Sequence, residues 1–255
     1  MRDTQKTTDY FADNISFATK AMLKRFQDTE QFPRVEGRPG RAHDLVAYAL
    51  QIVILRYSAG DEIQAIKGSV LQWIEASELQ QRVLASLPPK HEDKVMYERV
   101  TLDTVYDALT MMAFAKALHF KPEEMKRLID AIGHPGEDAL IDEAARALGD
   151  AQRPVAEACK FPKVYDPLLE IWRSEPADRP AKLLAFSKVW KKKIKPIYWS
   201  DSLNGAEGAY FGYWCFDVAL AAIVLGIDDQ KLRDNPYYPK DLVDAARAKQ
   251  TTPGG

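Results

Sequence analysis

The chain has 255 residues, of which 46% are hydrophobic and 28% charged, and its formal net charge is −2. These values are ordinary for a soluble globular protein, and the length is enough for one large or two small domains. The near balance of charge argues against a general nucleic-acid-binding protein, which needs a basic surface. The cysteines are Cys159 and Cys215, too few for a disulfide framework or a thiolate zinc site. We expect both to be reduced thiols in the core.

The composition of the N-terminal segment bears on where the protein is expected to reside. The N-terminal segment MRDTQKTTDYF is polar and lacks the apolar stretch of a signal peptide. We therefore expect a cytoplasmic protein. The last residues, 251–255 (TTPGG), have the composition of a disordered tail.

Helical periodicity dominates the chain. Apolar residues at steps of three and four, such as Phe11, Ile15, Ala18 and Met22, predict a first helix over 8–28. Alternation typical of strands is absent. The further predicted helices cover 41–58, 61–87, 99–120, 122–132, 137–148, 151–159, 163–173, 178–193, 205–226 and 241–249. The prediction is an all-α fold, a compact bundle of roughly ten helices.

The turn GHPGED, residues 133–138, is the best candidate for a boundary within this bundle. It divides the chain into an N-terminal helical region, 1–133, and a C-terminal helical region, 134–250. Because no flexible linker lies at the turn, we expect the two halves to pack as one body.

The most apolar segment is YFGYWCFDVALAAIVLGIDD, which starts at Tyr210. Small residues recur at steps of three and four over 205–226, so that a helix would carry all of them on one stripe: Gly205, Gly208, Gly212, Cys215, Ala219, Ala222 and Gly226. Such a stripe lets another helix approach closely. A membrane span is disfavoured, because Asp217 lies near its middle and no basic cluster flanks it. We therefore predict a central buried helix over 205–226.

Asp217 is the one acid in this apolar segment. It is expected to pair with a basic side chain or to accept hydrogen bonds, although a role in lining a pocket stays open. Zinc-protease, phosphate-loop and serine-hydrolase motifs are absent. We expect no enzymatic activity, no cofactor and no metal. The alternative is a metal-dependent or small-molecule helical hydrolase that uses Asp217, Asp228 and nearby acids.

A basic run, KVWKKKIK, covers 188–195 at the predicted end of a helix. Cations are favoured there by the helix dipole, which is a sufficient structural explanation. The alternative is a nucleic-acid-binding module that uses Lys188, Lys191, Lys192, Lys193 and Lys195.

The C-terminal part after this run is acidic and aromatic. From Tyr198 to Arg247 the chain has eight acidic and four basic residues. Aromatic side chains beside acids are typical of protein-recognition surfaces, where aromatics anchor and charges steer.

This part of the sequence resembles the C-terminal signature of the PoNi family of bacterial immunity proteins. The matching positions are Tyr210, Gly212, Tyr213, Trp214, Asp217, Ile227, Asp228, Asp229, Tyr237, Tyr238, Pro239, Asp241 and Leu242. The family often has glutamate at the position of Asp217. The loop 198–202 resembles the family's tryptophan-containing loop, and the strong match covers 162–247.

The resemblance implies a cytoplasmic inhibitor that binds a polymorphic toxin, often a DNase effector of the type VI secretion system. The expected partner is the toxin's nuclease domain, with neither nucleic acid nor a membrane bound directly. A nuclease binds DNA through a basic cleft, so exposed carboxylates suit its inhibitor. We therefore predict toxin contacts at Asp201, Asp228, Asp229 and Asp234, with Trp199 and Tyr237 as aromatic anchors.

Overall fold

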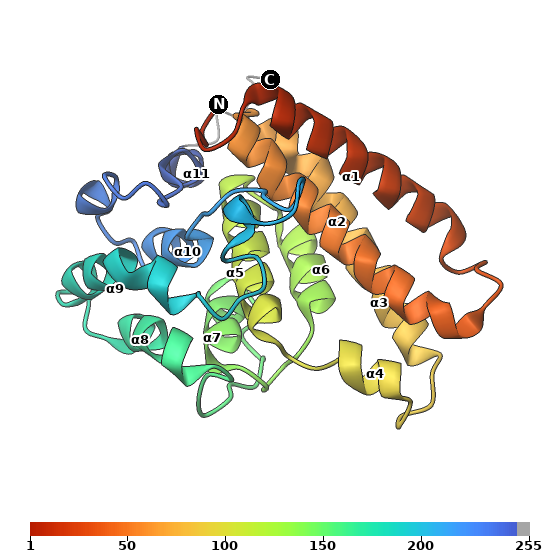
Figure 1. The fold of residues 1–255 in the computed structure, drawn as a ribbon. Coiled ribbons are helices and arrows are strands. Elements are labelled where there is room, and N and C mark those ends of the chain that lie inside the picture. The colour runs from red at the N-terminus through yellow and green to blue at the C-terminus, as the bar shows by residue number, and fades with distance from the viewer. Residues whose placement is uncertain (249–255) are drawn as a thin grey trace, which may run out of the picture. The chain divides into compact units, whose positions relative to one another are not determined.

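The structure is a computed structural model, and it describes residues 1–248. These residues contain eleven α-helices, four short 3-10 helices and no strand (Figure 1). The all-α prediction is confirmed. Within residues 1–248, no helix combines the length and the apolar character needed to span a membrane.

The chain forms two compact units. The segment 205–226, which the sequence predicts to be a single helix, is divided between them. Unit 1 comprises residues 1–99 and 201–212, and unit 2 comprises residues 100–200 together with the described residues from 213 onward. This grouping differs from the predicted boundary at residue 134, because the turn at 133–138 joins two helices of the same unit. The predicted tail, 251–255, lies outside the described residues.

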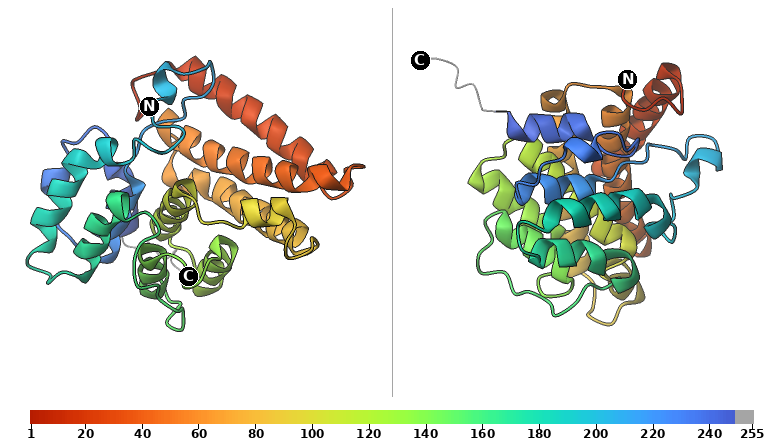
Figure 2. Two further views of the ribbon diagram at one scale, coloured as in Figure 1. Left: turned by 60° about the horizontal axis from the view of Figure 1, so that its bottom comes forward. Right: turned by 90° about the vertical axis from the view of Figure 1, so that its left-hand side faces the viewer.

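Unit 1 is built on three long helices, α1 (Thr8–Asp28), α2 (Arg38–Ala59) and α3 (Lys67–Ala85). They run antiparallel in sequence order, and α2 packs against both of the others (Figure 2). The turn after α2 is made at Gly60, whose φ of 99° is left-handed and therefore suits glycine. The remaining elements of this unit are η1 (Val35–Gly37), η2 (Ile63–Ile66), α4 (Glu92–Tyr97) and η3 (Ser202–Asn204). Helix α4 lies between two predicted helices, 61–87 and 99–120, in a segment where no helix was predicted.

Unit 2 is organised around α5 (Leu102–Ala117), a helix that is apolar on nearly all sides. It packs against four other helices: α6 (Pro122–Ile132), α7 (Ala139–Ala147), α10 (Phe216–Val224) and α11 (Lys240–Arg247). Two further helices, α8 (Pro162–Arg173) and α9 (Arg179–Lys193), lie side by side, and η4 (Gln230–Leu232) contacts α9. A helix buried on nearly all sides reads as continuously apolar. The sequence predicted a helix here, over 99–120, but assigned the central buried position to 205–226, of which α10 is a part.

The predicted helix over 151–159 is wrong. The Arg153 guanidinium donates to Asp142 Oδ1 at 2.6 Å and to the Gly133 carbonyl at 2.6 Å. The Ala156 N–H donates to the other Asp142 oxygen at 3.1 Å. The Ala156 N–H therefore donates to a side chain of α7 instead of to the backbone carbonyl that would accept it in a helix, and the segment stays a loop.

The predicted helix over 205–226 is wrong in its first half. Only Phe216–Val224 is helical, and residues 209–215 form no regular secondary structure. Gly208 and Gly212 have φ angles of 80° and 117°, which a right-handed helix does not contain. The small residues before Phe216 are therefore not a helix-packing stripe, and two of the glycines serve to turn the chain.

Tertiary hydrogen bonds explain why this segment is not helical. In unit 1, the Tyr10 hydroxyl donates to the Tyr210 carbonyl at 2.8 Å, and the Ser58 hydroxyl donates to the Phe211 carbonyl at 2.8 Å. The Tyr210 hydroxyl donates to Asp3 Oδ2 at 2.6 Å. These partners are distant in the sequence, so a local helical pattern could not reveal them.

Candidate functional site

The start of α10 is tied to the loop that precedes α11. The Cys215 N–H donates to the Tyr237 carbonyl at 2.9 Å, and its Sγ donates to the same oxygen at 3.1 Å. This contact brings together the two ends of the resemblance, the aromatic run before α10 and the Tyr237-Tyr238 pair. The loop between them, residues 225–239, carries four of the predicted contact residues, three of them acidic.

Asp217 lies in the first turn of α10 and is only 1% exposed. Its Oδ2 accepts a hydrogen bond from the Trp190 indole at 3.1 Å, and its Oδ1 accepts one from the Val218 N–H at 2.8 Å. Burial raises the pKa of Asp217 from 3.8 to about 7, and the two hydrogen bonds limit the rise. The expectation of a hydrogen-bonded buried acid is confirmed.

The hydrolase alternative, which uses Asp217, Asp228 and nearby acids, gains no support at this position. Both oxygens of Asp217 face protein donors, and the residue lines neither of the pockets described below. Among residues 1–248 no group of three histidine, cysteine, aspartate or glutamate side chains is placed to hold a metal ion.

Trp199, one of the predicted aromatic anchors, belongs to the core of unit 2. It is 1% exposed and packs on Tyr106 at 4.7 Å and on Tyr213 at 6.1 Å between ring centroids. A side chain this deeply buried has no surface to offer a partner. It supports the position of the aromatic segment that follows it.

Asp229 is also buried, at 3% exposure, and its carboxylate holds two arginines. Arg247 Nη1 donates to it at 2.5 Å, and Arg233 Nε lies 3.2 Å from its second oxygen. Arg247 also donates to the Ile227 carbonyl at 2.7 Å. Asp229 thereby connects the end of the α10 segment to α11 and is a structural residue.

The other predicted contact residues lie at the surface. Asp201 is exposed in unit 1, and Asp228 and Asp234 are exposed in unit 2. Asp228 Oδ1 accepts a hydrogen bond at 3.1 Å from the N–H of Gln230, the first residue of η4. Tyr237 is half-buried, with its ring 5.6 Å from that of Trp190.

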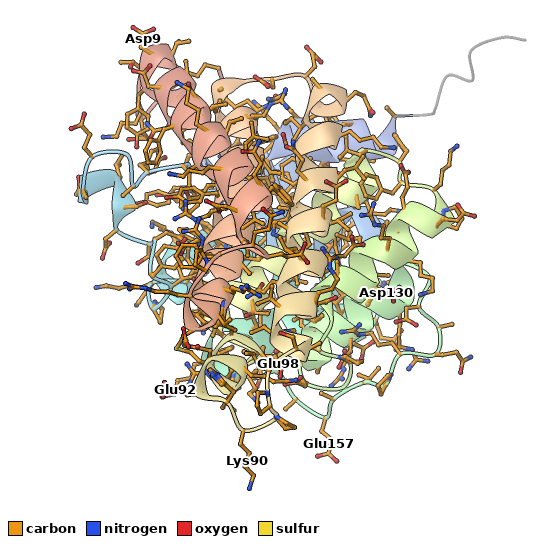
Figure 3. The ribbon with its side chains drawn as sticks, turned by 90° about the vertical axis from the view of Figure 1, so that its right-hand side faces the viewer. Asp9, Lys90, Glu92, Glu98, Asp130 and Glu157 are labelled. Atoms are coloured by element: carbon orange, nitrogen blue, oxygen red, sulfur yellow. The ribbon has the colours of Figure 1, made fainter. Side chains whose placement is uncertain are left out.

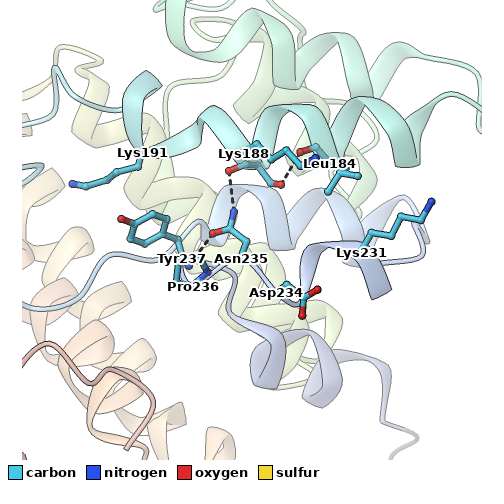
Figure 4. Close-up of a pocket in the computed structure, with 9 residues that line it drawn as sticks. Leu184, Lys188, Lys191, Lys231, Asp234, Asn235, Pro236 and Tyr237 are labelled. Carbon is cyan, nitrogen blue, oxygen red and sulfur yellow. Dashed lines mark hydrogen bonds between the residues drawn. The ribbon is translucent and has the colours of Figure 1, made fainter.

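A pocket of about 610 Å³ lies between α9 and the loop after η4 (Figure 4). Asn235 joins the two walls: its Nδ2 donates to the Ser187 carbonyl at 2.9 Å, and its Oδ1 accepts from the Tyr237 N–H at 3.0 Å. The pocket is lined by Leu184, Ser187, Lys188, Lys191, Lys231, Asp234, Asn235, Pro236 and Tyr237. Asp234 thus lines the same pocket as Lys188, Lys191 and Lys231, and the charged lining of this pocket is mainly basic.

A second pocket, of about 700 Å³, is lined by Lys163, Val164, Val189, Lys192, Lys193, Lys195 and Pro196. The residues of α9 that line it differ from those that line the first pocket, so the basic run serves both. The basic run is visible in the sequence, but its neighbours Lys163 and Lys231, which line the same pockets from α8 and η4, are not. The only available signal was the helical spacing of Lys188 and Lys192.

Comparison with protein families gives one match to this region. Residues 136–242 match the family model described as PoNe immunity proteins (PoNi), C-terminal. The match begins within the turn before α7 and ends in α11, so that it covers α7 to α10 and both pockets. No curated protein matches the chain.

Comparison with solved structures supports the fold of the whole chain. The crystal structure of protein PA2201 from Pseudomonas aeruginosa aligns with a TM-score of 0.70 and 17% sequence identity. The alignment covers 96% of this chain and 90% of that one. At this identity the similarity concerns the fold alone. The resemblance found in the sequence is confirmed by the family match: residues 136–242 of this chain are similar to the C-terminal region of the PoNi family of immunity proteins.

Proposed function

We propose that this protein neutralises a cognate antibacterial toxin by binding it in the cytoplasm of the cell that makes both. The toxin is a DNase effector of the type VI secretion system, and the bound immunity protein covers its nuclease domain. The proposal includes no catalytic activity and no cofactor for the immunity protein itself. The observation that carries it is the family match over residues 136–242.

The proposed mode of binding is electrostatic attraction between carboxylates of this protein and basic side chains of the nuclease. A nuclease attracts DNA through basic side chains, and a protein that presents carboxylates to the same side chains competes with the phosphates. Asp201 and Asp228 are exposed and form no ion pair with any residue in 1–248. Trp199 and Asp229 contribute indirectly, by holding the segments that carry the exposed residues.

The decisive experiment uses the toxin domain encoded beside this gene. The purified chain is added to that domain in a pull-down and in a DNA-cleavage assay. A stable complex in which cleavage is lost supports the proposal. A complex that still cleaves DNA would mean that the chain binds the toxin without covering its nuclease domain. The absence of any complex would mean that this toxin is not the partner.

A charge-reversal variant tests the role of the two exposed carboxylates. In Asp201→Lys combined with Asp228→Lys, we expect the dissociation constant for the toxin domain to rise at least about tenfold, because two favourable charges become repulsive. Calorimetric titration measures this change. Circular dichroism and urea denaturation check that the variant is folded.

The matched control reverses two other exposed acids, Glu157→Lys with Glu175→Lys. Both side chains are exposed and form no ion pair with a described residue, and Glu157 points away from the ribbon in Figure 3. The control has the same net charge as the test variant, so a general charge effect would weaken both equally. Equal affinities for the wild type and the test variant would remove Asp201 and Asp228 from the interface.

A further inference from the structure

Unit 2 carries a basic surface that the proposed function does not use. Seven lysines and a single aspartate line the two pockets beside α9. We call this the α9 lysine surface, defined by Lys163, Lys188, Lys191, Lys192, Lys193, Lys195 and Lys231. Its lysines come from α8, from α9 and the segment after it, and from η4, so the fold gathers them.

Six of the seven lysines of this surface have no acidic partner in the described part of the chain. Lys163, Lys188 and Lys192 form no ion pair with any residue in 1–248, and the same is true of Lys193, Lys195 and Lys231. By contrast, Lys182 on the same helix reaches Glu170 at 2.6 Å. Collecting these six lysines without carboxylates to pair with them raises the free energy of the folded state, and that cost is recovered when a partner supplies the opposite charge.

The helix dipole explains only part of the α9 lysine surface. It favours cations in the last turn of α9, where Lys191, Lys192 and Lys193 lie. Lys188 lies one turn earlier, and Lys163 lies at the start of α8, where the dipole disfavours a cation.

The pocket walls indicate which kind of anion fits. Between the lysines lie apolar side chains, Val164 and Val189 in one pocket and Leu184 with Pro236 in the other. Val189 is 42% exposed, so apolar surface is open to a partner. A phosphate backbone gains nothing from such walls, and neither pocket is lined by an arginine, the side chain best shaped for phosphate. Carboxylates on a protein chain, with apolar side chains beside them, match both features.

We propose that the α9 lysine surface binds an acidic protein segment whose apolar or aromatic side chains enter the two pockets. Its aspartate and glutamate side chains lie against Lys188, Lys192 and their neighbours. Each exposed lysine–carboxylate contact is weak and screened by salt, so binding depends on several lysines acting together with the pockets.

The test uses fluorescence anisotropy with the full chain and a labelled random copolymer of glutamate and tyrosine as the probe. The comparison ligands are polyglutamate and a single-stranded DNA of equal charge. At about 100 mM salt we expect the glutamate–tyrosine copolymer to bind at least about fivefold more tightly than either, because it alone supplies carboxylates and rings together. The probe contains no toxin, so the result is independent of the proposed function.

Two variants and one control locate the binding. Lys188→Glu with Lys192→Glu is expected to weaken copolymer binding at least about tenfold, whereas Val189→Ser is expected to remove most of the preference over polyglutamate. The control is Lys20→Glu with Lys24→Glu, which makes the same charge change at the same spacing on the exposed face of α1. Equal loss in the control, tighter binding of the DNA, or no preference for the copolymer would each overturn the proposal.

Discussion

At the scale of single residues, Asp217 is the most unusual group in the protein. It is an acid in an otherwise apolar helix, and its environment favours the neutral form: burial raises the pKa to about 7. The Trp190 indole and the Val218 N–H satisfy its oxygens, so the residue specifies how α10 meets α9 rather than performing chemistry. A buried carboxyl of this kind makes stability depend on pH.

The pH dependence has a definite direction. Between about pH 4 and pH 7 the folded state holds the Asp217 proton and the unfolded chain releases it, so the stabilisation present at low pH is lost as pH rises. A pKa difference of about 3 units corresponds to about 4 kcal/mol. Urea denaturation gives the free energy of unfolding of the wild type and of Asp217→Asn. The value for the wild type minus that for the variant should fall by a few kcal/mol from pH 4 to pH 7. A constant difference would mean that Asp217 is ionised throughout this range.

At the scale of elements, the segment before α10 shows how backbone geometry overrides a helical pattern. Gly212 has a φ of 117°, and the preceding carbonyls of Tyr210 and Phe211 are held by the hydroxyls of Tyr10 and Ser58. The chain is thus fixed immediately before a conformation that only glycine adopts easily.

Substitution of Gly212 distinguishes the observed structure from the predicted helix. Gly212→Ala is expected to destabilise the fold by roughly 1–3 kcal/mol, because alanine is strained at this φ. Had the segment been helical, the same change would have stabilised it by up to about 1 kcal/mol. Thermal and urea denaturation measure the sign directly.

Gly68→Ala is the control for Gly212→Ala. Gly68 lies in the first turn of α3, and a Cβ there meets nothing within 4 Å. It should stabilise by roughly 0.5 kcal/mol. Stabilisation by both substitutions would contradict the positive φ at residue 212.

At the scale of the whole molecule, the two cysteines report on the integrity of the core of unit 2. Cys159 is 5% exposed and Cys215 is fully buried, and burial raises the pKa of both thiols well above the usual range. Only the thiolate reacts with disulfide reagents, so both groups are protected in the folded state.

Thiol titration tests this protection. With Ellman's reagent at pH 8 we expect no fast reaction of the native protein and two reactive thiols per chain in guanidinium chloride. The native rate should rise with denaturant in parallel with unfolding. Fast reaction of one thiol in native buffer would place that cysteine at the surface.

The sequence determined the fold class and the family. Helical periodicity is a local property, and α1 is found with the same bounds as predicted, Thr8–Asp28. The aromatic signature around Tyr213 and Trp214 pointed to the family because those residues build the core, at 8% and 6% exposure. The buried state of Cys159, Cys215 and Asp217 also followed from their apolar neighbours.

The tertiary structure alone decided which signature residues face solvent. Trp199 and Asp229 were expected at the surface because aromatic and acidic residues in loops are often exposed, but Tyr106 and Arg247 cover them from elements about 90 and 20 residues away. The same reason applies to the α9 lysine surface, since Lys163 and Lys231 reach it only through the packing of α8 and η4. Long-range pairing of side chains is not encoded in local periodicity, and it therefore set the position of the loops and the chemistry of the surface.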